Sequence, residues 1–470
     1  MSSLPYSVDA LTRLSARKSR KGHDPTRIDP GVDLCFETLS KSRELYRSNR
    51  KLHAGDDAAL ENLKKKYEKR RKKLRKKRDV AIQSAIENGV TDFEKSLSGG
   101  AFSWGLKAGP ELAKPGPGAS RQTFQIPSEL GHSLPHLQVS AVVRKAAKLT
   151  PQSRNSVVRA LQQSLRRYYG HSILKLDIQD FFGSIPHEKL LTKLGSNGAI
   201  DSISLTLVSK LLENFRRIAG VSSGVPQGVG LSSQLAEFYL SDFDRTIRSF
   251  EGVTFYSRYV DDIVIVIDSP ENRALVDTKI GFELASLQLV ENARKRQEFD
   301  TAEDGSYAGG RFSNGDQLEY LGYRFSNETK KLSTMISDRR MAARKKRIEL
   351  AFQSWSKHGP DPRRPNHGLD ALLVDRLRYL AGNLRLRHSK SNVVVGIYFS
   401  NSALDVGSSQ LSELDAILAR LVTATRVRMT SELRKRIEQI SFEEGFREKT
   451  FFRAKQPRID RIVACWRSTL

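Results

Sequence analysis

The chain has 470 residues and carries 79 Lys and Arg against 53 Asp and Glu, a formal net charge of +26. At roughly 100–200 residues per domain this length predicts two to three domains, and the charge predicts a polyanionic partner, nucleic acid before an anionic membrane. The two cysteines exclude a disulfide framework and a four-cysteine zinc site. The sequence shows neither an apolar run that could span a membrane nor the apolar core of a signal peptide, so we expect a soluble, cytoplasmic protein with no membrane partner.

One basic segment dominates the N-terminal part of the chain. Between Lys64 and Arg78, 12 of 15 residues are Lys or Arg. Apolar residues recur at helical spacing around this run, which predicts a helix from about Asp57 to Glu87 with one narrow apolar seam. The run is either a solvated helix face or an arm that binds phosphates. We favour the arm, because so many like charges repel one another unless a polyanion neutralises them.

After loops and short strands rich in Gly and Pro at 96–127, hydrophobic periodicity predicts alternating helices and strands. Helices are expected at 139–149, 153–169, 184–194, 202–215, 231–250 and 279–290, strands at 172–178 and 318–326, and a β-hairpin at 253–267. In the helix at 184–194, Ser184 is the expected N-cap and Pro186 lies in the first turn. From about Asp338 onward the pattern is basic and mostly helical, with one strand-like interruption at 392–400.

Three acidic residues stand out against this pattern. Asp177 lies near the end of the apolar strand at 172–178, and Asp261 and Asp262 lie at the tip of the hairpin. A carboxylate beside apolar strand residues is costly unless it is paired or binds a metal. Three converging carboxylates in a basic protein predict a site for two hard cations, which suits in-line attack on phosphorus. The alternative is a turn whose aspartates only cap backbone groups.

The segments around these aspartates resemble the reverse transcriptases. The matching segments are LDIQDFF at 176–182 (motif A), GVPQGVGLSSQLAEFYL at 224–240 (motif B), YVDD at 259–262 (motif C), VENARK at 290–295 (motif D) and LGYRF at 321–325 (motif E). The five motifs occur in the family's order and spacing, and the resemblance covers about residues 110–330.

This resemblance implies an α+β fold of the right-hand polymerase type. It would contain an antiparallel palm sheet, fingers and a helical thumb, preceded here by a basic helical N-terminal extension. The expected domains are the extension at 1–95, the fingers and palm of the reverse transcriptase domain at 96–335, and a basic helical thumb or C-terminal domain at 336–470.

The resemblance also implies a catalytic site. Asp177 and Asp261 would be metal ligands, with Asp262 as a supporting carboxylate in the same site. The cofactors would be two Mg²⁺ ions, with Mn²⁺ as an alternative. Lys295 would protonate the pyrophosphate, unless it is an ordinary surface lysine.

The nucleotide-binding residues implied by the resemblance are Lys114, Arg121, Phe182, Gln227, Gly228 and Tyr259. Lys114 and Arg121 resemble the cations of a fingers hairpin that holds the triphosphate, and Arg144 or Lys145 are alternatives for this role. Phe182 takes the position of the aromatic gate against the ribose 2′-hydroxyl.

The remaining nucleotide-binding residues would contact the primer and the template. Tyr259 would lie near the primer end. Gln227 and Gly228, together with Gly224 and Pro226, would shape the loop under the incoming base and the template.

Some details differ from the common family pattern. Ser232–Ser233 stands where motif B usually has Ser-Pro, and Ala236–Glu237 follows. With SRNSVVRALQQSL before motif A and SDFDRTI after motif B, these details resemble the bacterial defence-associated reverse transcriptases of the abortive-infection and unknown-group lineages. Among these, we expect a resemblance to a type 3 antiphage system, which pairs two such enzymes.

The expected function is therefore RNA-directed DNA synthesis from dNTPs in bacterial antiviral defence. The expected partners are a template or non-coding RNA, the DNA product, and a second reverse transcriptase or other defence subunit. One alternative is a catalytically idle RNA-binding subunit, which the intact aspartates disfavour. The other is an RNA-dependent RNA polymerase, which Phe182 and the Tyr-Val-Asp-Asp sequence disfavour.

Overall fold

The computed structural model describes residues 5–20, 24–113, 120–148, 153–166, 171–301, 307–309, 317–328, 331–357, 367–386, 393–405 and 408–469. The chain divides into two compact units that interleave along the sequence. Unit 1 comprises residues 1–150, 179–244 and 283–290, and unit 2 comprises 151–178, 245–282 and 291–470. The domain boundaries expected after residues 95 and 335 stay predictions. Each unit combines several separate segments of the chain, so the units do not test boundaries between consecutive domains.

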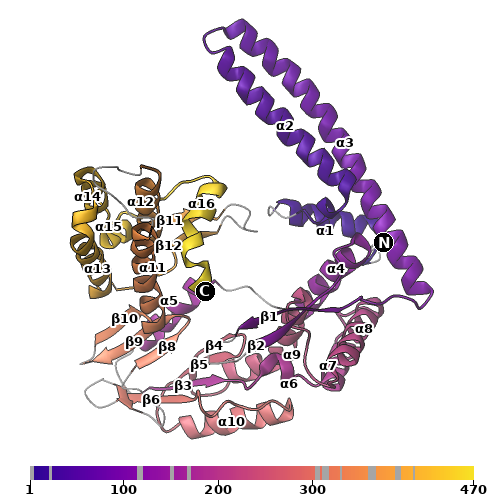
Figure 1. Cartoon of the computed structure of the whole chain (residues 1–470). Coiled ribbons are helices and arrows are strands. Elements are labelled where there is room, and N and C mark those ends of the chain that lie inside the picture. Colours follow the sequence, from indigo (N-terminus) through magenta and orange to yellow (C-terminus); the bar gives the residue numbers. More distant parts are fainter. Residues whose placement is uncertain are drawn as a thin grey trace. The chain divides into compact units, whose positions relative to one another are not determined.

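Unit 1 is mainly helical and contains a single antiparallel strand pair among its described residues (Figure 1). Its elements are α1 (Val8–Arg20), η1 (Pro25–Ile28), α2 (Pro30–Leu52), α3 (Asp57–Ser98), β1 (Lys107–Ala113), β2 (Ser120–Gln125), α4 (Leu130–Ala146), α6 (Phe181–Ser184), α7 (His187–Gly195), α8 (Ser202–Ala219) and most of α9 (Gly230–Arg248).

The basic segment forms part of the long helix α3. This helix begins at Asp57, as predicted, because the Asp56 side chain caps it by accepting a hydrogen bond from Ala59 N at 2.9 Å. It continues beyond the predicted end to Ser98, because residues 85–93 carry an apolar face. That face packs with α1, α2 and α4 in a small core. In Figure 1, α2 and α3 lie side by side as a helical hairpin.

Unit 2 contains the larger sheet and the C-terminal helices. Its elements are α5 (Arg154–Leu165), β3 (Ser172–Asp177), β4 (Val253–Tyr259), β5 (Asp262–Ile267), most of α10 (Arg273–Ser286), β6 (Gln297–Thr301), β7 (Tyr307–Gly309), β8 (Gln317–Tyr320), β9 (Tyr323–Glu328), β10 (Lys331–Ile336), α11 (Asp338–Ser356), α12 (His367–Ala381), β11 (Asn383–Arg385), β12 (Val394–Gly396), α13 (Ser409–Thr425), η2 (Arg426–Arg428), α14 (Ser431–Glu438), α15 (Phe442–Arg447), α16 (Gln456–Val463) and η3 (Ala464–Thr469).

A five-stranded antiparallel sheet with the order β4-β5-β3-β6-β7 positions the acidic residues. Alternate residues of a strand point to opposite faces, and Val264 and Val266 of β5 pack on one face with Val158 and Leu161 of α5. The hairpin expected at 253–267 is confirmed as β4 and β5. The sheet therefore has a covered face that fixes its register.

The C-terminal helices of unit 2 surround a core of their own. Ile348, Phe352 and Trp355 of α11 pack there with side chains from α12 and α13. The indole Nε1 of Trp355 donates to Asp370 Oδ1 at 2.8 Å, so this polar pair is satisfied within the core. The expected helical C-terminal part is confirmed. The one strand expected at 392–400 is shorter, Val394–Gly396, and it pairs with a second strand, β11, that was not predicted.

Two local predictions were wrong. Ser184 does not cap the helix that begins at His187, because Phe181–Ser184 forms the short helix α6 and the Ser184 hydroxyl donates to Asp180 O at 2.9 Å. Pro186 takes the N-cap position instead. The segment 318–326 is not one strand. It is the pair β8 and β9, joined by a tight turn in which Leu321 and Gly322 have φ of 50° and 75°.

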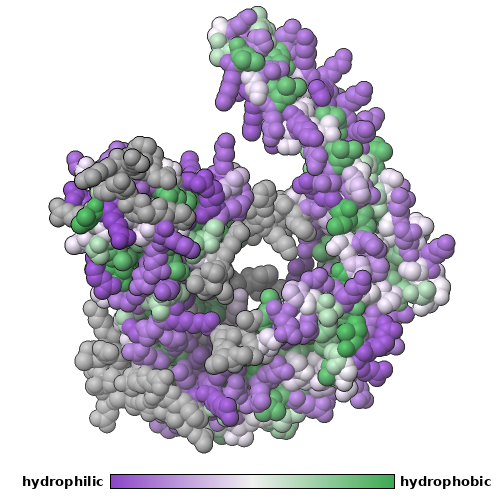
Figure 2. Space-filling view, viewed as in Figure 1, coloured by the Kyte–Doolittle hydropathy of each residue, from purple (hydrophilic) through white to green (hydrophobic). Residues whose placement is uncertain are grey.

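In the described part of the chain, no helix has both the length and the hydropathy that a membrane crossing requires. Figure 2 shows hydrophilic side chains over most of the upper part of the view, where α2 and α3 lie.

Candidate active site

The palm sheet brings the three aspartates together at one end of adjacent strands. β3 ends at Asp177, β5 begins at Asp262, and the antiparallel register pairs these two residues. On the other side of β5, Asp262 pairs with Tyr259, whose side chain is 57% exposed. Asp261 lies in the turn, and its carbonyl accepts a hydrogen bond from Ile178 N at 3.2 Å. The backbone thus gathers Asp177, Tyr259, Asp261 and Asp262, which are four of the five predicted residues in motifs A and C.

The turn that carries Asp261 is strained. Val260 has φ of 64°, in the left-handed region that β-branched residues rarely adopt. Such a conformation costs of order 1–3 kcal/mol and persists only where the surrounding structure enforces it. Here the paired strands β4 and β5 enforce it, and the result is a two-residue turn that holds Asp261 beside Asp262.

The Asp262 carboxylate is the most perturbed group of the site. Its Oδ1 atom is buried and accepts no hydrogen bond from any residue that the structure describes, and Lys175 Nζ lies 3.7 Å away. Burial raises the pKa of Asp262 to about 6. Lys175 opposes this change, whereas the charges of Asp177 and Asp261 add to it. A further positive charge would therefore stabilise this carboxylate.

Lys295 lies on the carboxylate of Asp177. Its Nζ atom is 2.9 Å from Asp177 Oδ1 and 2.8 Å from Oδ2, and Asn292 Nδ2 donates to Oδ1 at 3.3 Å. Burial alone would lower the pKa of Lys295, but the hydrogen bond to Asp177 and the charges of the three aspartates raise it. Lys295 is thus a protonated ion-pair partner of Asp177 in this structure.

The donor set fits hard cations. The described residues contain no group of three or more His, Cys, Asp or Glu side chains arranged to hold a metal ion. Yet Asp177 and Asp262 are register partners, and one buried oxygen of Asp262 lacks a hydrogen-bond partner within the described ranges. Carboxylate oxygens are the ligands that Mg²⁺ and Mn²⁺ prefer. The residues present therefore fit a divalent cation at this strand edge.

An arginine is held close to this edge by the β8–β9 turn. Arg154 Nε donates to Leu321 O at 2.7 Å, Nη1 donates to Ser400 O at 2.9 Å, and the guanidinium lies 4.8 Å from the ring centroid of Tyr323. Its Nη2 atom is buried and has no hydrogen-bond partner among the described residues. Burial lowers the pKa of Arg154, and interactions with Tyr323 and Tyr259 oppose this.

Two further arginines on α11 extend the cluster. Burial is the main cause that lowers the pKa of Arg340 and of Arg344 to about 10, and the charge of Arg154 contributes to both shifts. Arg344 also interacts unfavourably with Arg340 and Arg347. Like charges held together in a partly buried place favour an anion. Arg154, Arg340 and Arg344 thus form an arginine cluster, and this name is kept below.

The motif B loop belongs to unit 1 and depends on two glycines. Gly224 has φ of 88°, and a Cβ there would lie 2.9 Å from Gly183 O. Gly228 has φ of 95°, and a Cβ there would lie 2.8 Å from Phe124 O. Phe124 N also donates to Gln227 O at 2.6 Å. The loop is therefore packed against β2 and α6, with the Gln227 side chain partly exposed.

Phe182 and its neighbour Phe181 differ in burial. Phe181 is only 2% exposed and belongs to the core, whereas Phe182 is partly exposed. The two rings contact edge to face with centroids 5.6 Å apart. Phe182 O accepts a hydrogen bond from Val225 N at 2.8 Å, which ties the position of Phe182 to the motif B loop. Of the two rings, Phe182 is the one accessible to a ligand.

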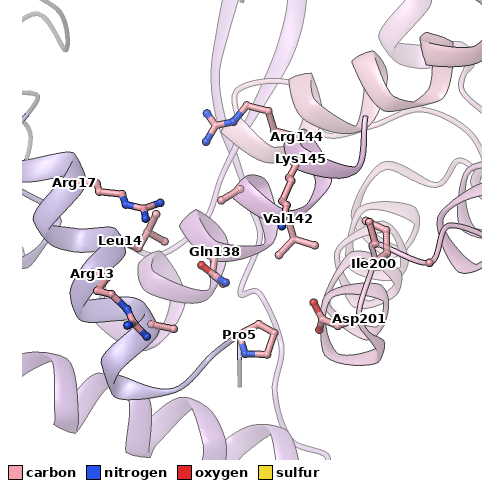
Figure 3. Close-up of a pocket in the computed structure, with 14 residues that line it drawn as sticks. Pro5, Arg13, Leu14, Arg17, Gln138, Val142, Arg144, Lys145, Ile200 and Asp201 are labelled. Atoms are coloured by element: carbon pink, nitrogen blue, oxygen red, sulfur yellow. The ribbon is translucent and has the colours of Figure 1, made fainter. Parts of the chain in front are cut away.

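The expected triphosphate-binding cations lie in different places. Arg121 is exposed on β2, opposite Leu112 in the β1–β2 register. Lys114 lies outside the described residues. The alternatives Arg144 and Lys145 line a cavity of about 810 Å³ (Figure 3). Other lining residues are Arg13 and Arg17 of α1, and none comes from β1 or β2.

Several contributors to the site were missed by sequence reasoning. Leu231 N, at the start of α9, donates a hydrogen bond to His136 Nε2 at 3.1 Å. Burial, together with the charge of Lys18, lowers the pKa of His136 to about 4. The imidazole of His136 is therefore neutral near pH 7. The Ser232 hydroxyl donates to Pro226 O at 2.6 Å and closes the motif B loop. The His136 contact joins segments 95 residues apart, which no local pattern indicates. The Ser232 contact is local, six residues apart within motif B, and a serine at this position gives no signal of its own.

Comparison with known proteins identifies the domain that contains this site. Residues 130–325 match the family described as reverse transcriptase (RNA-dependent DNA polymerase). This part of the chain is a reverse transcriptase domain, which is a nucleotidyltransferase domain of right-hand polymerase fold, so the expected fold class is confirmed. No curated protein has significant sequence similarity to the chain.

Solved structures similar to this chain include telomerases of two yeasts. Telomerase from Candida albicans in complex with a fragment of telomeric RNA has 11% identity and a TM-score of 0.37 over 81% of this chain and 68% of that one. Apo telomerase from Candida tropicalis has 11% identity and a TM-score of 0.37 over 82% and 70%. The Candida tropicalis enzyme truncated from its C-terminal domain has 12% identity and a TM-score of 0.36, over 53% of this chain and 59% of that one.

Proposed function

We propose that, through its reverse transcriptase domain, this chain is an RNA-directed DNA polymerase that adds dNTPs to a primer 3′ end. The observation that carries the proposal is the pairing of Asp177 with Asp262 across β3 and β5, with Asp261 in the adjoining turn. All three lie within the segment that matches the family. The experiment that tests it is extension of a DNA primer annealed to an RNA template.

In the proposed reaction, the primer 3′-hydroxyl oxygen attacks the α-phosphorus of the dNTP. The bond from this phosphorus to the bridging oxygen breaks, pyrophosphate leaves, and the hydroxyl proton is released. Two divalent cations held by Asp177, Asp261 and Asp262 would supply charge neutralisation when bound. The chain's own contribution is to fix these carboxylates on a rigid sheet edge, since phosphoryl transfer depends mostly on positioning and electrostatics.

Lys295 is proposed as the proton donor to the leaving pyrophosphate. Its raised pKa keeps it protonated near neutral pH, and its ion pair with Asp177 holds it at the site. Tyr259, exposed beside Asp262, is proposed to support the primer end. Gln227 and Gly228 are proposed to lie under the incoming base, and Phe182 to exclude the ribose 2′-hydroxyl.

The arginine cluster is proposed to hold the backbone of a nucleic-acid strand. Its members are partly buried, repel one another, and include the Nη2 atom of Arg154, which no described residue contacts by a hydrogen bond. Replacing both Arg340 and Arg344 with Gln should weaken template–primer binding and lower the slope of log affinity against log salt by about two units. Thermal stability should change little, because relief of the mutual repulsion offsets the loss of the hydrogen bond from Arg340 Nη1 to Gly322 O at 3.3 Å. A fall in stability with unchanged binding would make the cluster structural.

The biological setting is proposed to be bacterial antiviral defence, with a bound RNA as template or scaffold. The support is the resemblance of the segments around motifs A and B to defence-associated enzymes, including Ser232–Ser233 and Ala236–Glu237. A second reverse transcriptase or another defence subunit is the proposed protein partner. Plaque counts on bacteria that carry the system with and without an intact Asp261 test this setting, and equal protection by both would contradict a defence role for the synthesis.

A further inference from the structure

The basic half of α3 leaves most of its charge exposed. Residues 57–84 of this helix include no buried residue, because the buried positions are all within 85–93. Twelve basic residues lie between Lys64 and Arg78. The ten that are exposed are Lys64, Lys65, Lys66, Lys69, Arg70, Lys72, Lys73, Arg75, Lys76 and Lys77. Only the narrow seam expected from the sequence is partly covered.

Few of these charges are neutralised within the chain. Lys65 pairs with Glu61 at 3.3 Å, and Arg78 pairs with Asp79 at 2.6 Å. The other ten make no hydrogen bond or ion pair with any described residue, namely Lys64, Lys66, Lys69, Arg70, Arg71, Lys72, Lys73, Arg75, Lys76 and Lys77. Over about 20 Å of helix, this concentration of like charge favours a polyanion as the neutralising partner.

The aromatic rings of the α2–α3 hairpin are engaged in packing. Tyr46 of α2 and Tyr67 of α3 stack with ring centroids 4.2 Å apart. The ring of Phe36 lies under the guanidinium groups of Arg27 and Arg78, at 5.0 and 5.5 Å. Recognition of single strands depends on aromatic rings that are free to stack on bases. The described part of the hairpin between 30 and 84 offers cations but no free Phe, Tyr or Trp ring.

We infer that the basic half of α3 is a binding surface for double-helical RNA, contacted through its phosphates. The charge and the engaged rings favour a backbone-binding surface, and double-stranded RNA is recognised mostly through its shape and backbone. The choice of RNA rather than DNA rests on the proposed function, in which the enzyme works on an RNA. The surface adds affinity and no sequence preference, because the deep, narrow major groove of A-form RNA keeps these side chains from the base edges.

The test compares the full chain with a variant in which Lys66, Lys69, Arg70, Lys73, Lys76 and Lys77 are all Gln. Gln matches Lys and Arg in helix propensity, so α3 should remain folded. The probe is an RNA hairpin of about 16 base pairs. If all six cations contact phosphates, the slope of log affinity against log salt should fall by up to about five units. When salt is raised fourfold, the unaltered chain should then lose about a thousandfold more affinity for the hairpin than the Gln variant loses.

The matched control keeps the charge and changes the residues. It exchanges Lys for Arg and Arg for Lys at the same six positions, and its salt slope should equal that of the unaltered chain. A single-stranded RNA of equal length should bind the unaltered chain more weakly than the hairpin. An unchanged slope in the Gln variant would overturn the inference, and so would tighter binding of the single strand. If the Gln variant lost binding to anionic vesicles but bound the RNA hairpin as the unaltered chain does, the surface would be assigned to membranes instead.

The choice of RNA is tested on nucleic acid that co-purifies with the chain. We expect material that RNase removes and DNase does not, and less of it on the Gln variant. Material that DNase removes and RNase does not would overturn the choice of RNA. The Gln variant should still extend a short annealed primer at saturating template concentration. If the unaltered chain fails to extend primers but keeps its salt-dependent RNA binding, the proposed function fails and the RNA-binding surface stands.

Discussion

Replacing Asp261 with Asn should abolish DNA synthesis and leave the fold and RNA binding nearly intact. The residue lies in the two-residue turn that places it beside Asp262 and next to the end of β3. Loss of one ligand charge from a two-metal site removes several kcal/mol of transition-state stabilisation, which is roughly a thousandfold or more in rate. The measurement is the initial rate of dNTP incorporation at saturating template–primer.

Asp268 offers a matched control for this substitution. It follows β5 at the opposite end from Asp262, is exposed, and accepts a hydrogen bond from Asn272 Nδ2 at 2.9 Å. Asp268→Asn makes the same chemical change on the same hairpin and should leave the rate within a few-fold of the unaltered chain. If Asp261→Asn retains activity within tenfold, the assignment of Asp261 as a metal ligand is wrong.

Replacing Phe182 with Ala or Val should admit ribonucleotides. The ring follows Asp177 by five residues, it is partly exposed, and its backbone is tied to the motif B loop through Val225. A bulky ring beside the sugar has no hydrogen-bond partner for a 2′-hydroxyl and no room for it. NTP incorporation should therefore rise by one to three orders of magnitude, roughly 1.4–4 kcal/mol of discrimination, while DNA synthesis falls modestly.

The measurement is the ratio of kcat/KM for dNTP and NTP in both proteins. Phe181→Leu is the control, because Phe181 is 2% exposed and belongs to the core. That variant should lose stability without a change in the ratio. A ratio that does not move in the Phe182 variants would make Phe182 a packing residue. The case for a DNA product would then depend on family resemblance alone.

The elements of the palm could be predicted because their patterns are local. The apolar run of β5, the short turn before it and the acidic residue that ends β3 are all visible in the sequence, and the hairpin follows from them. The turn at Leu321–Gly322 was missed because Leu-Gly is not a usual turn pair, and the positive φ of Leu321 is imposed by the pairing of β8 with β9. The end of α3 was missed because burial, rather than helix propensity, extends it.

The site shows the same division between local and distant signals. Asp177, Asp261 and Asp262 could be placed together from strand ends and a hairpin tip. The contacts that tune them could not. Family resemblance predicts Lys295 as a site residue, but its ion pair with Asp177, 118 residues away in sequence, has no local signal. The arginine cluster joins α5 to α11, and no periodicity within either helix indicates that their arginines meet.

The most direct test of the proposed activity is RNA-templated primer extension by the full purified chain. A DNA primer is annealed to a defined RNA template and supplied with dNTPs, with Mg²⁺ present or removed by chelation. We predict a product whose sequence is complementary to the RNA, formed only with Mg²⁺, and absent when Asp177 or Asp261 is replaced by Asn. Absence of any templated product from the unaltered chain, or a product built from NTPs in preference to dNTPs, would contradict the assignment of this protein as an RNA-directed DNA polymerase.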